Sequence, residues 1–267
     1  MTTVKEEAPA MRSVAVEVEV PGTPEEVWQA IATGPGITAW FVPTEVEERE
    51  GGETVSHFGE GPEMDAKGTV TVWEPPRRVV FEAENWMPGA PPLATETLVE
   101  ARGGGTCVVR LVTSLFTSRA DWDDQLDSMK TGWASYLQIL KLYLTHFPGQ
   151  RCASISVSGG SSLPLDEAWA ALRGALGLTE AAEGQRAAAT AADAPALAGV
   201  VEQVDDHKLV LRTDRPAPGI ALVSVFACPG VMTYFHAYLY GDGAPAVAAR
   251  EQPAWRDWMA AHFTPRG

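Results

Sequence analysis

The first half of the chain alternates apolar and polar residues in short runs, which is the pattern of half-buried β-strands. The clearest run covers residues 13–20, where valine recurs at every second position from Val14 to Val20. The same alternation predicts further strands near residues 45–50, 54–58, 68–73, 79–83, 95–101 and 106–114. Prolines and glycines between these runs mark turns, so the segment predicts an antiparallel sheet.

Helical signals follow the first of these strands. Thr23 is a predicted N-cap, Pro24 suits the first helical position, and Glu26 completes a capping box. The Gly-Pro-Gly sequence at 34–36 is expected to end this helix, and a second, short helix is expected over residues 37–41.

A change of period marks the end of the first half. From Trp122 to Phe147, apolar residues recur three or four positions apart, which predicts a long amphipathic helix that ends before Pro148. Strands followed by a terminal helix indicate the α+β class, in which the helix covers one face of a curved antiparallel sheet.

The second half repeats this order in a shorter form. Residues 166–172 resemble residues 25–31 with their tryptophans aligned, and the last helix of each half ends in a His-Phe pair. Strands are predicted near residues 154–158, 199–204, 208–213, 220–227 and 231–240. The shared order indicates an internal duplication, with one domain at 1–150 and a shorter, degenerate copy at 151–267.

Two segments of the second half allow more than one structure. The alanine-rich residues 187–192 are compatible with a strand, a helix or a loop. Residues 216–241 carry no Asp, Glu, Lys or Arg and are long enough for a membrane span. Cys-Pro-Gly at 228–230 interrupts them with turn chemistry, so we expect a β-hairpin there and no membrane segment.

Composition narrows the classes of partner. The 267 residues include 20 Lys and Arg against 35 Asp and Glu, a formal charge of −15, which disfavours binding to nucleic acid or to anionic membranes. Three cysteines at wide spacings do not indicate a disulfide framework, and residues 1–10 lack the apolar region of a signal peptide. A cytoplasmic location is therefore expected.

The sequence lacks the motifs of several large enzyme classes. It contains no G-x-S-x-G, no phosphate-binding glycine loop and no H-E-x-x-H. Its five histidines do not have the spacing of metal ligands. No catalytic residue, no metal and no cofactor is therefore predicted.

Nine tryptophans stand out, and six of them fall in the first half. Most large aromatic side chains build cores, but some line apolar pockets for small molecules. By strict alternation Trp73 shares a strand face with Thr69 and Thr71, opposite Val70 and Val72. Only one of these two sets is therefore expected to point inward.

Several short matches to a known family occur in a fixed order over residues 13–147. They are Val14–Val20, Pro24–Trp28, Trp40-Phe41, Gly51–Thr54, Gly68–Phe81, Gly105-Thr106 and Gly132-Trp133. In this order they resemble homologues of the activator of heat-shock-protein-90 ATPase, within the START-like, Bet v 1-like (SRPBCC) superfamily. The resemblance implies a helix-grip fold, in which a curved antiparallel sheet wraps around a long C-terminal helix with an apolar cavity between them.

The resemblance and the aromatic residues together favour a binding function. We expect a small hydrophobic or aromatic ligand in the cavity of the first domain, without catalysis. The predicted ligand-binding residues, with His57 as the polar anchor, are Trp40, Phe41, His57, Phe58, Trp73, Phe81, Trp86, Phe116, Trp133 and Leu137.

Two alternative functions stay open at this point. A cyclase- or hydrolase-type enzyme would use the same cavity, with His57 paired to Glu63 or Asp65 as a proton shuttle. A co-chaperone-like protein would bind a protein partner through the acidic residues 45–53. A second copy of the chain, forming a homodimer, is the other protein partner considered.

Overall fold

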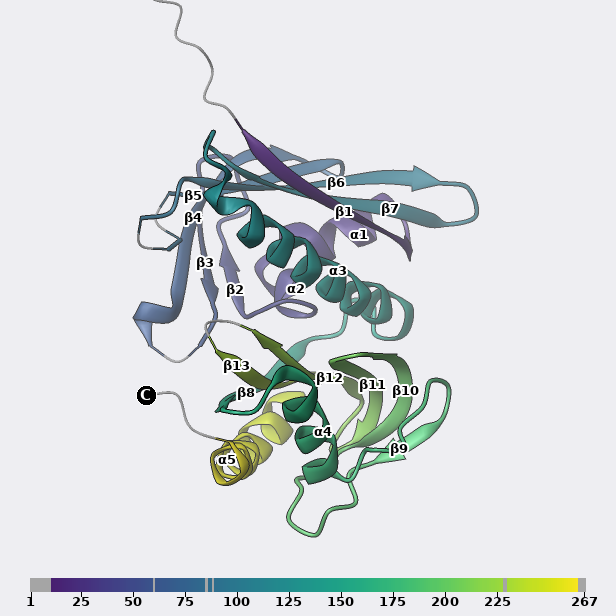
Figure 1. Cartoon of the computed structure of the whole chain (residues 1–267). Coiled ribbons are helices and arrows are strands. Elements are labelled where there is room, and N and C mark those ends of the chain that lie inside the picture. The colour runs from purple at the N-terminus through teal and green to yellow at the C-terminus, as the bar shows by residue number, and fades with distance from the viewer. Residues whose placement is uncertain (1–10, 60, 85, 88, 228–229, 264–267) are drawn as a thin grey trace, which may run out of the picture. The chain divides into compact units, whose positions relative to one another are not determined.

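The computed structural model describes residues 11–59, 61–84, 86–87, 89–227 and 230–263. The chain forms two compact units that divide between Gly149 and Gln150. Each unit is an antiparallel sheet packed against a long helix, so the α+β class and the tandem helix-grip architecture are confirmed (Figure 1).

The first unit, in the part that the structure describes, has seven strands and three α-helices. They are β1 (Arg12–Pro21), α1 (Pro24–Ala32), α2 (Gly34–Thr38), β2 (Thr44–Val46), β3 (Glu53–His57), β4 (Asp65–Glu74), β5 (Arg78–Ala83), β6 (Leu93–Arg102), β7 (Thr106–Leu115) and α3 (Asp123–His146). The sheet order is β1-β7-β6-β5-β4-β3-β2, with every neighbouring pair antiparallel. The first strand thus pairs with the last, and α3 crosses one face of the sheet (Figure 1).

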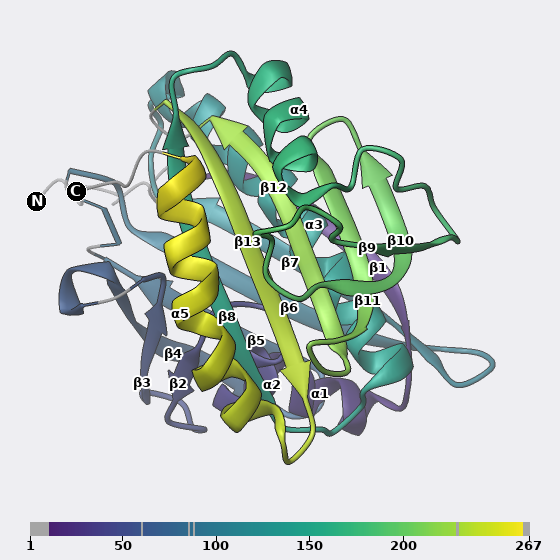
Figure 2. The same ribbon diagram turned by 90° about the horizontal axis from the view of Figure 1, so that it is seen from below.

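The second unit follows the same plan with fewer elements. Its described elements are β8 (Cys152–Ser161), α4 (Leu165–Leu176), β9 (Arg186–Ala188), β10 (Ala198–Asp205), β11 (Lys208–Arg215), β12 (Gly219–Ala227), β13 (Val231–Tyr240) and α5 (Ala244–His262). The sheet order is β8-β13-β12-β11-β10-β9, so again the first strand pairs with the last. Figure 2 shows α5 lying along β8 and β13, with α4 on the same face of the sheet.

The start of α1 confirms the predicted capping box. The Thr23 hydroxyl accepts a hydrogen bond from the Glu26 backbone N–H (3.3 Å), and the Glu26 carboxylate accepts one from the Thr23 N–H (2.8 Å). These bonds satisfy two N–H groups that have no partner within the helix.

The second helix begins three residues earlier than predicted. Thr33 caps α2 by accepting a hydrogen bond from the Gly36 N–H (3.1 Å), so the Gly-Pro-Gly sequence at 34–36 starts a helix. A Cβ at Gly36 would lie 1.8 Å from the Gln29 carbonyl oxygen, so only glycine allows α2 to approach α1 this closely. The expected helix 37–41 is therefore corrected to Gly34–Thr38.

The acidic strand predicted at residues 45–50 is shorter than expected. β2 ends at Val46, and the Glu47 N–H donates to the Glu53 carbonyl oxygen (2.9 Å) across a turn. Gly51 in this turn has a φ of +74°, a conformation that favours glycine. Most of the acidic residues therefore lie in an exposed turn and not in a strand.

β4 carries a bulge that simple alternation did not predict. The register of β4 against β5 shifts at Thr71, which is an extra residue. Val70 opposes Phe81. Trp73 opposes Val79, which lies two positions before Phe81 on β5 and so points to the same face as Phe81. Val70 and Trp73 therefore point to the same face. The expectation that Trp73 lies on the face opposite Val70 was wrong.

The hairpin predicted at 216–241 is confirmed, since β12 and β13 pair antiparallel along their full described length. Its predicted turn residues Cys228 and Pro229 lie outside the described residues. In the alanine-rich segment, Ala187 and Ala188 belong to the short strand β9, which pairs with β10. No helix in the described part of the chain is both long and apolar enough to cross a membrane.

Candidate ligand-binding site

Strand register defines which side chains share a face of the first sheet. One row of directly opposed residues crosses five strands and consists of Val14, Thr113, Thr95, Phe81 and Val70. Opposed residues of an antiparallel sheet point to the same side, so this row lies on one face.

Two contacts show that this row faces the helices. Val14 and Leu126 of α3 line the same pocket, and Trp73, on the same face as Val70, lies edge-on against Trp28 of α1 with ring centroids 5.0 Å apart. We call this side of the first sheet the inner face and the opposite side the outer face.

The inner face is tightly packed toward one end. Val20, Cys107 and Val109 are at most 1% exposed. In the C-terminal half of α3, Leu137 and Leu140 are buried to the same degree. Methyl and methylene groups fill this end as in an ordinary protein core.

Toward the other end the inner face is more open. Thr95 and Phe81 on the sheet remain partly exposed, as do Met129 and Trp133 in the N-terminal half of α3. These four side chains are therefore less enclosed than those at the packed end.

Five aromatic rings gather where α3 passes the loop after α2. Phe41 is their centre, and its ring centroid lies 4.7 Å from Tyr136, 4.9 Å from Trp133, 5.7 Å from Phe58 and 6.0 Å from Trp40. We call these five residues the Phe41 cluster. Phe58 is 50% exposed, so the cluster reaches the surface. Edge-to-face pairs of this kind add stability beyond their buried area.

Sequence reasoning brought four of these five together as candidates and missed the fifth. Trp40, Phe41, Phe58 and Trp133 were predicted to line one cavity, and they are in contact. Tyr136 was not singled out. Its position three residues after Trp133 on a predicted helix was the available signal, since such residues are neighbours on a helix face.

The remaining predicted residues are spread over other places. Trp73 and Phe81 lie on the inner face, and Leu137 lies in its packed part. Trp86 follows β5, donates its indole N–H to the Pro91 carbonyl oxygen (2.8 Å) and packs against Trp122 at 6.2 Å. Phe116 directly follows β7 and is partly exposed. The structure thus does not bring all ten predicted residues into one site.

The structure separates His57 from the inner face. Thr54 opposes Gly68, two residues before Val70 on β4, so Thr54 belongs to the inner face. His57 lies three positions further along β3 and therefore points to the outer face. The predicted polar anchor thus does not share a face with the aromatic side chains that it was expected to serve.

His57 forms an acid–base pair on that outer face. Its Nδ1 lies 2.6 Å from Asp65 Oδ1, and its Nε2 lies 3.5 Å from Glu45 Oε1. The hydrogen bond with Asp65 raises the pKa of His57 above its ordinary value, and partial burial opposes this effect. Of the two predicted partners, Asp65 is therefore in contact with His57, whereas Glu63 is exposed on the following turn.

Thiols and metal ligands give no further candidate in the described residues. Cys107 and Cys152 are free, and burial raises the pKa of both thiols, that of Cys152 to about 12. Cys228 lies outside the described residues. No group of three His, Cys, Asp or Glu side chains in this part of the chain is arranged to hold a metal ion.

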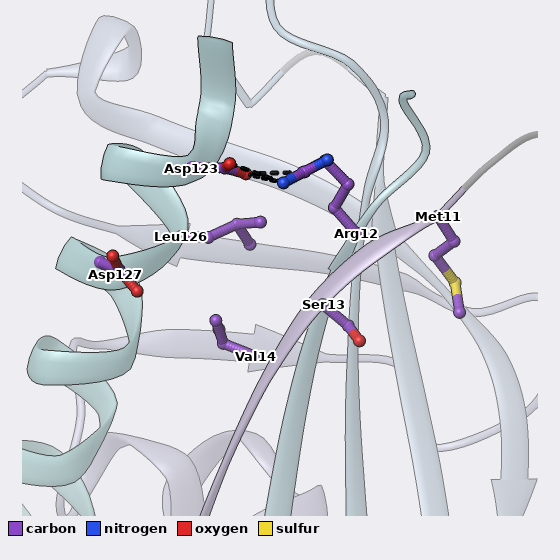
Figure 3. Close-up of a pocket in the computed structure, with 7 residues that line it drawn as sticks. All are labelled: Met11, Arg12, Ser13, Val14, Asp123, Leu126 and Asp127. Carbon is purple, nitrogen blue, oxygen red and sulfur yellow. Dashed lines mark hydrogen bonds and ion pairs between the residues drawn. The ribbon is translucent and has the colours of Figure 1, made fainter. Parts of the chain in front are cut away.

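A pocket of about 450 Å³ lies at the seam between the start of β1 and the first turns of α3 (Figure 3). The Arg12 guanidinium spans it and forms two hydrogen bonds of 2.6 Å to the Asp123 carboxylate. Val14 and Leu126 face each other below this ion pair. Sequence reasoning missed this site, because Arg12 and Asp123 lie 111 positions apart and neither belongs to a motif.

The folded architecture defines a class of protein. An antiparallel sheet whose first and last strands pair, closed on one face by a long C-terminal helix, is a helix-grip α+β domain, and the chain carries two of them in tandem. Residues 21–145 match the family described as activator of Hsp90 ATPase homolog 1-like protein, and this domain belongs to that family. The family resemblance stated from the sequence is therefore confirmed.

Several solved structures are similar to parts or to most of this chain. CalU16 from Micromonospora echinospora is 23% identical, with 52% of this chain and 78% of that chain covered and a TM-score of 0.43. DynU16, a protein of the dynemicin biosynthetic locus, is 19% identical over 94% of this chain and 97% of its own (TM-score 0.43). The di-domain ARO/CYC protein BexL from the BE-7585A biosynthetic pathway is 15% identical over 96% and 100% (TM-score 0.46). No curated protein matches the chain.

Proposed function

We propose that the first unit binds a small apolar or aromatic molecule between the inner face and the N-terminal half of α3. The observation that carries this proposal is the partial exposure of two large aromatic side chains, Phe81 on the inner face and Trp133 on α3. A closed core buries such side chains, because each contributes about 1.5–3 kcal/mol when it is fully removed from water. A ligand of matching chemistry completes that burial.

The side chains around the proposed binding region suit an aromatic ligand. Flat rings bind other flat rings in offset-stacked or edge-to-face geometry, and the Phe41 cluster already uses both tilted and edge-to-face contacts. Trp73 and Phe81 on the sheet offer further ring edges and faces. Ligand pockets of this kind are apolar with a few polar groups that orient the ligand.

The enzyme alternative is less well supported by this geometry. It requires His57 as a proton shuttle in the same cavity, and a general acid or base must be within hydrogen-bond reach of the reacting atom. His57 and Asp65 belong to the outer face, so they do not meet a molecule bound at the inner face. Binding is therefore the function that we put forward.

A thermal-shift experiment on the full chain tests the proposal. A panel of small aromatic compounds that includes 2-naphthol and 2-methylnaphthalene is screened for stabilisation, which is expected because a ligand that binds the folded state raises Tm. Trp133→Ala should abolish the shift. Phe226→Ala, which removes an exposed aromatic side chain of the second unit, is the matched control and should leave it unchanged. Absence of any shift, or an undiminished shift in Trp133→Ala, would contradict the proposal.

Protein-partner binding is the second candidate, and one observation favours it. The glutamates of the β2–β3 segment are exposed and outnumber its basic residues, and these are Glu45, Glu47, Glu48, Glu50 and Glu53. An acidic surface of this kind favours a basic partner surface and a strong dependence on ionic strength. Binding of purified Hsp90, compared at low and high salt, tests this candidate; no binding at any ionic strength would contradict it.

A further inference from the structure

One buried polar atom on the inner face lacks a partner. The Thr113 side chain is 1% exposed, and its hydroxyl has no hydrogen-bond partner among the described residues. Leaving a buried hydroxyl unsatisfied costs about 1–3 kcal/mol, so native proteins rarely keep one without a reason.

The position of Thr113 connects this hydroxyl to the proposed binding region. Thr113 lies between Val14 and Thr95 in the row that crosses the inner face, and neighbouring strands are about 4.8 Å apart. Val14 lines the seam pocket together with Leu126 (Figure 3). On the other side, Thr95 is partly exposed and opposes the partly exposed Phe81. The Thr113 hydroxyl therefore lies between Val14, which lines the pocket between β1 and α3, and the side of the inner face that carries Phe81.

We propose that Thr113 is the polar anchor of the ligand site and hydrogen-bonds an oxygen atom carried by an aromatic ligand. This inference rests on the proposed function and adds the chemical class of the ligand: an aromatic molecule with at least one hydroxyl or carbonyl oxygen. Thr95, the cross-strand neighbour of Thr113, places a second hydroxyl beside the first. A hydroxyl both donates and accepts, so either kind of ligand oxygen satisfies it.

The second unit contains an internal comparison for this role. Thr233 on β13 is also fully buried and also lies on the last strand of its sheet beside the first. Its hydroxyl donates to the Gly159 carbonyl oxygen at 3.1 Å. The protein itself satisfies the Thr233 hydroxyl, whereas Thr113 has no such partner in the described chain.

Two matched compounds test the anchor in the full chain. 2-Naphthol and 2-methylnaphthalene have nearly the same shape, but only the first carries a hydroxyl. We expect the wild-type chain to bind 2-naphthol about tenfold more tightly, the effect of one hydrogen bond at the upper end of the usual range. Dissociation constants are measured by quenching of tryptophan fluorescence.

Substitutions at Thr113 then assign the preference to this residue. Thr113→Val keeps the shape and removes the hydroxyl, so it should bind the two compounds equally. Thr113→Ser keeps the hydroxyl and should retain the preference for 2-naphthol. Preference that persists in Thr113→Val, or equal binding of both compounds to the wild type, would overturn the anchor and leave the proposed function intact. Failure of every compound of the aromatic panel to bind the wild type would contradict the proposed function, and the anchor with it.

Stability without any compound gives an independent readout. Removing an unsatisfied buried hydroxyl should raise Tm by a few degrees in Thr113→Val. A fall in Tm would show that the hydroxyl has a partner inside the protein, and this result would overturn the inference even if the chain binds aromatic compounds.

Discussion

The two units share a topology but differ in how their interiors are filled. In the second unit the helix-facing side of the sheet is closed by residues that are at most 1% exposed, and these are Leu209, Leu211, Ala221, Val223, Phe235, Ala237 and Leu239. Trp255 of α5 stacks on Phe235 with ring centroids 3.5 Å apart. In the first unit, Phe81 on the inner face and Trp133 on α3 stay partly exposed.

This difference shows that the fold does not by itself create a binding site. Both sheets place their first strand beside their last, and the long helix of each unit packs against the first strand, α3 on β1 and α5 on β8. The core of the second unit also contains large rings, among them Trp169, Trp255 and Trp258, and all of them are buried, whereas in the first unit Phe81 and Trp133 stay partly exposed. A site therefore depends on which side chains occupy the inner positions of a shared architecture.

The tryptophans of the two long helices should give the largest contrast. Trp255→Ala removes a fully buried side chain and is expected to cost about 3–5 kcal/mol. Trp133→Ala removes a partly exposed one and should cost about 1–2 kcal/mol. Urea unfolding of the full chain, followed by circular dichroism, measures both changes. Equal losses would show that the first interior is packed as tightly as the second and would break the comparison.

The two buried threonines should respond in opposite directions to the same substitution. Thr233→Val breaks the hydrogen bond to the Gly159 carbonyl oxygen and is expected to lower the free energy of unfolding by about 1 kcal/mol. Thr113→Val should raise it. Thermal unfolding of the two variants beside the wild type checks the signs, and a loss of similar size in both would remove the distinction between the two sites.

The fold was largely predictable because its signals are local. Alternation marks β1 within one residue at each end, and the spacing of apolar residues marks α3 equally well. The Thr71 bulge was not predictable from alternation, because one extra residue moves every later side chain of the strand to the opposite face of the sheet. The early start of α2 was missed because Gly-Pro-Gly also suits a helix end.

The candidate site was less predictable because it depends on contacts between distant segments. Phe41 and Trp133 were both identified as aromatic candidates, but only the packing of α3 brings them to 4.9 Å. His57 was chosen because a histidine can serve as a polar anchor. The face to which it points follows from strand register, which the sequence pattern of a short strand leaves open. Thr113 was not identified from the sequence as a site residue, because a missing hydrogen bond is visible only in the folded protein.

The first helices of the two units offer a smaller contrast. α1 begins with a capping box, so Thr23→Ala should cost about 1 kcal/mol. The corresponding N-cap of α4 is Pro164, which makes no side-chain hydrogen bond, and Glu167 occupies the third helical position. A variant with serine at position 164 would complete a capping box with Glu167. Its free energy of unfolding should exceed that of the variant with alanine at position 164 by about 1 kcal/mol. Denaturant unfolding of these variants measures the effect, and equal stability of the two residues at 164 would refute it.

Both units also hold His–Asp pairs, two of them in the second unit, and the pair in the first unit gives the smallest expected effect. The nitrogen–oxygen distance is 2.6 Å both for His57 with Asp65, which joins two strands, and for His207 with Asp166, which joins a turn to α4. Asp65→Asn removes the main cause of the raised pKa of His57, so this pKa should fall. Titration of the His57 ring protons by NMR measures the change. Glu45→Gln, at 3.5 Å, is the control and should have a smaller effect.

The same pair fixes the sign of a pH dependence. Because the pKa of His57 is raised in the folded state, the pair contributes stability that is fully present below the ordinary histidine pKa of about 6.5 and is lost as pH rises through the raised value. Asp65→Asn should therefore destabilise the chain most at mildly acidic pH and have little effect at pH values above the raised pKa of His57. A pH-independent loss would show that Asp65 acts through strand pairing and not through the charge of His57.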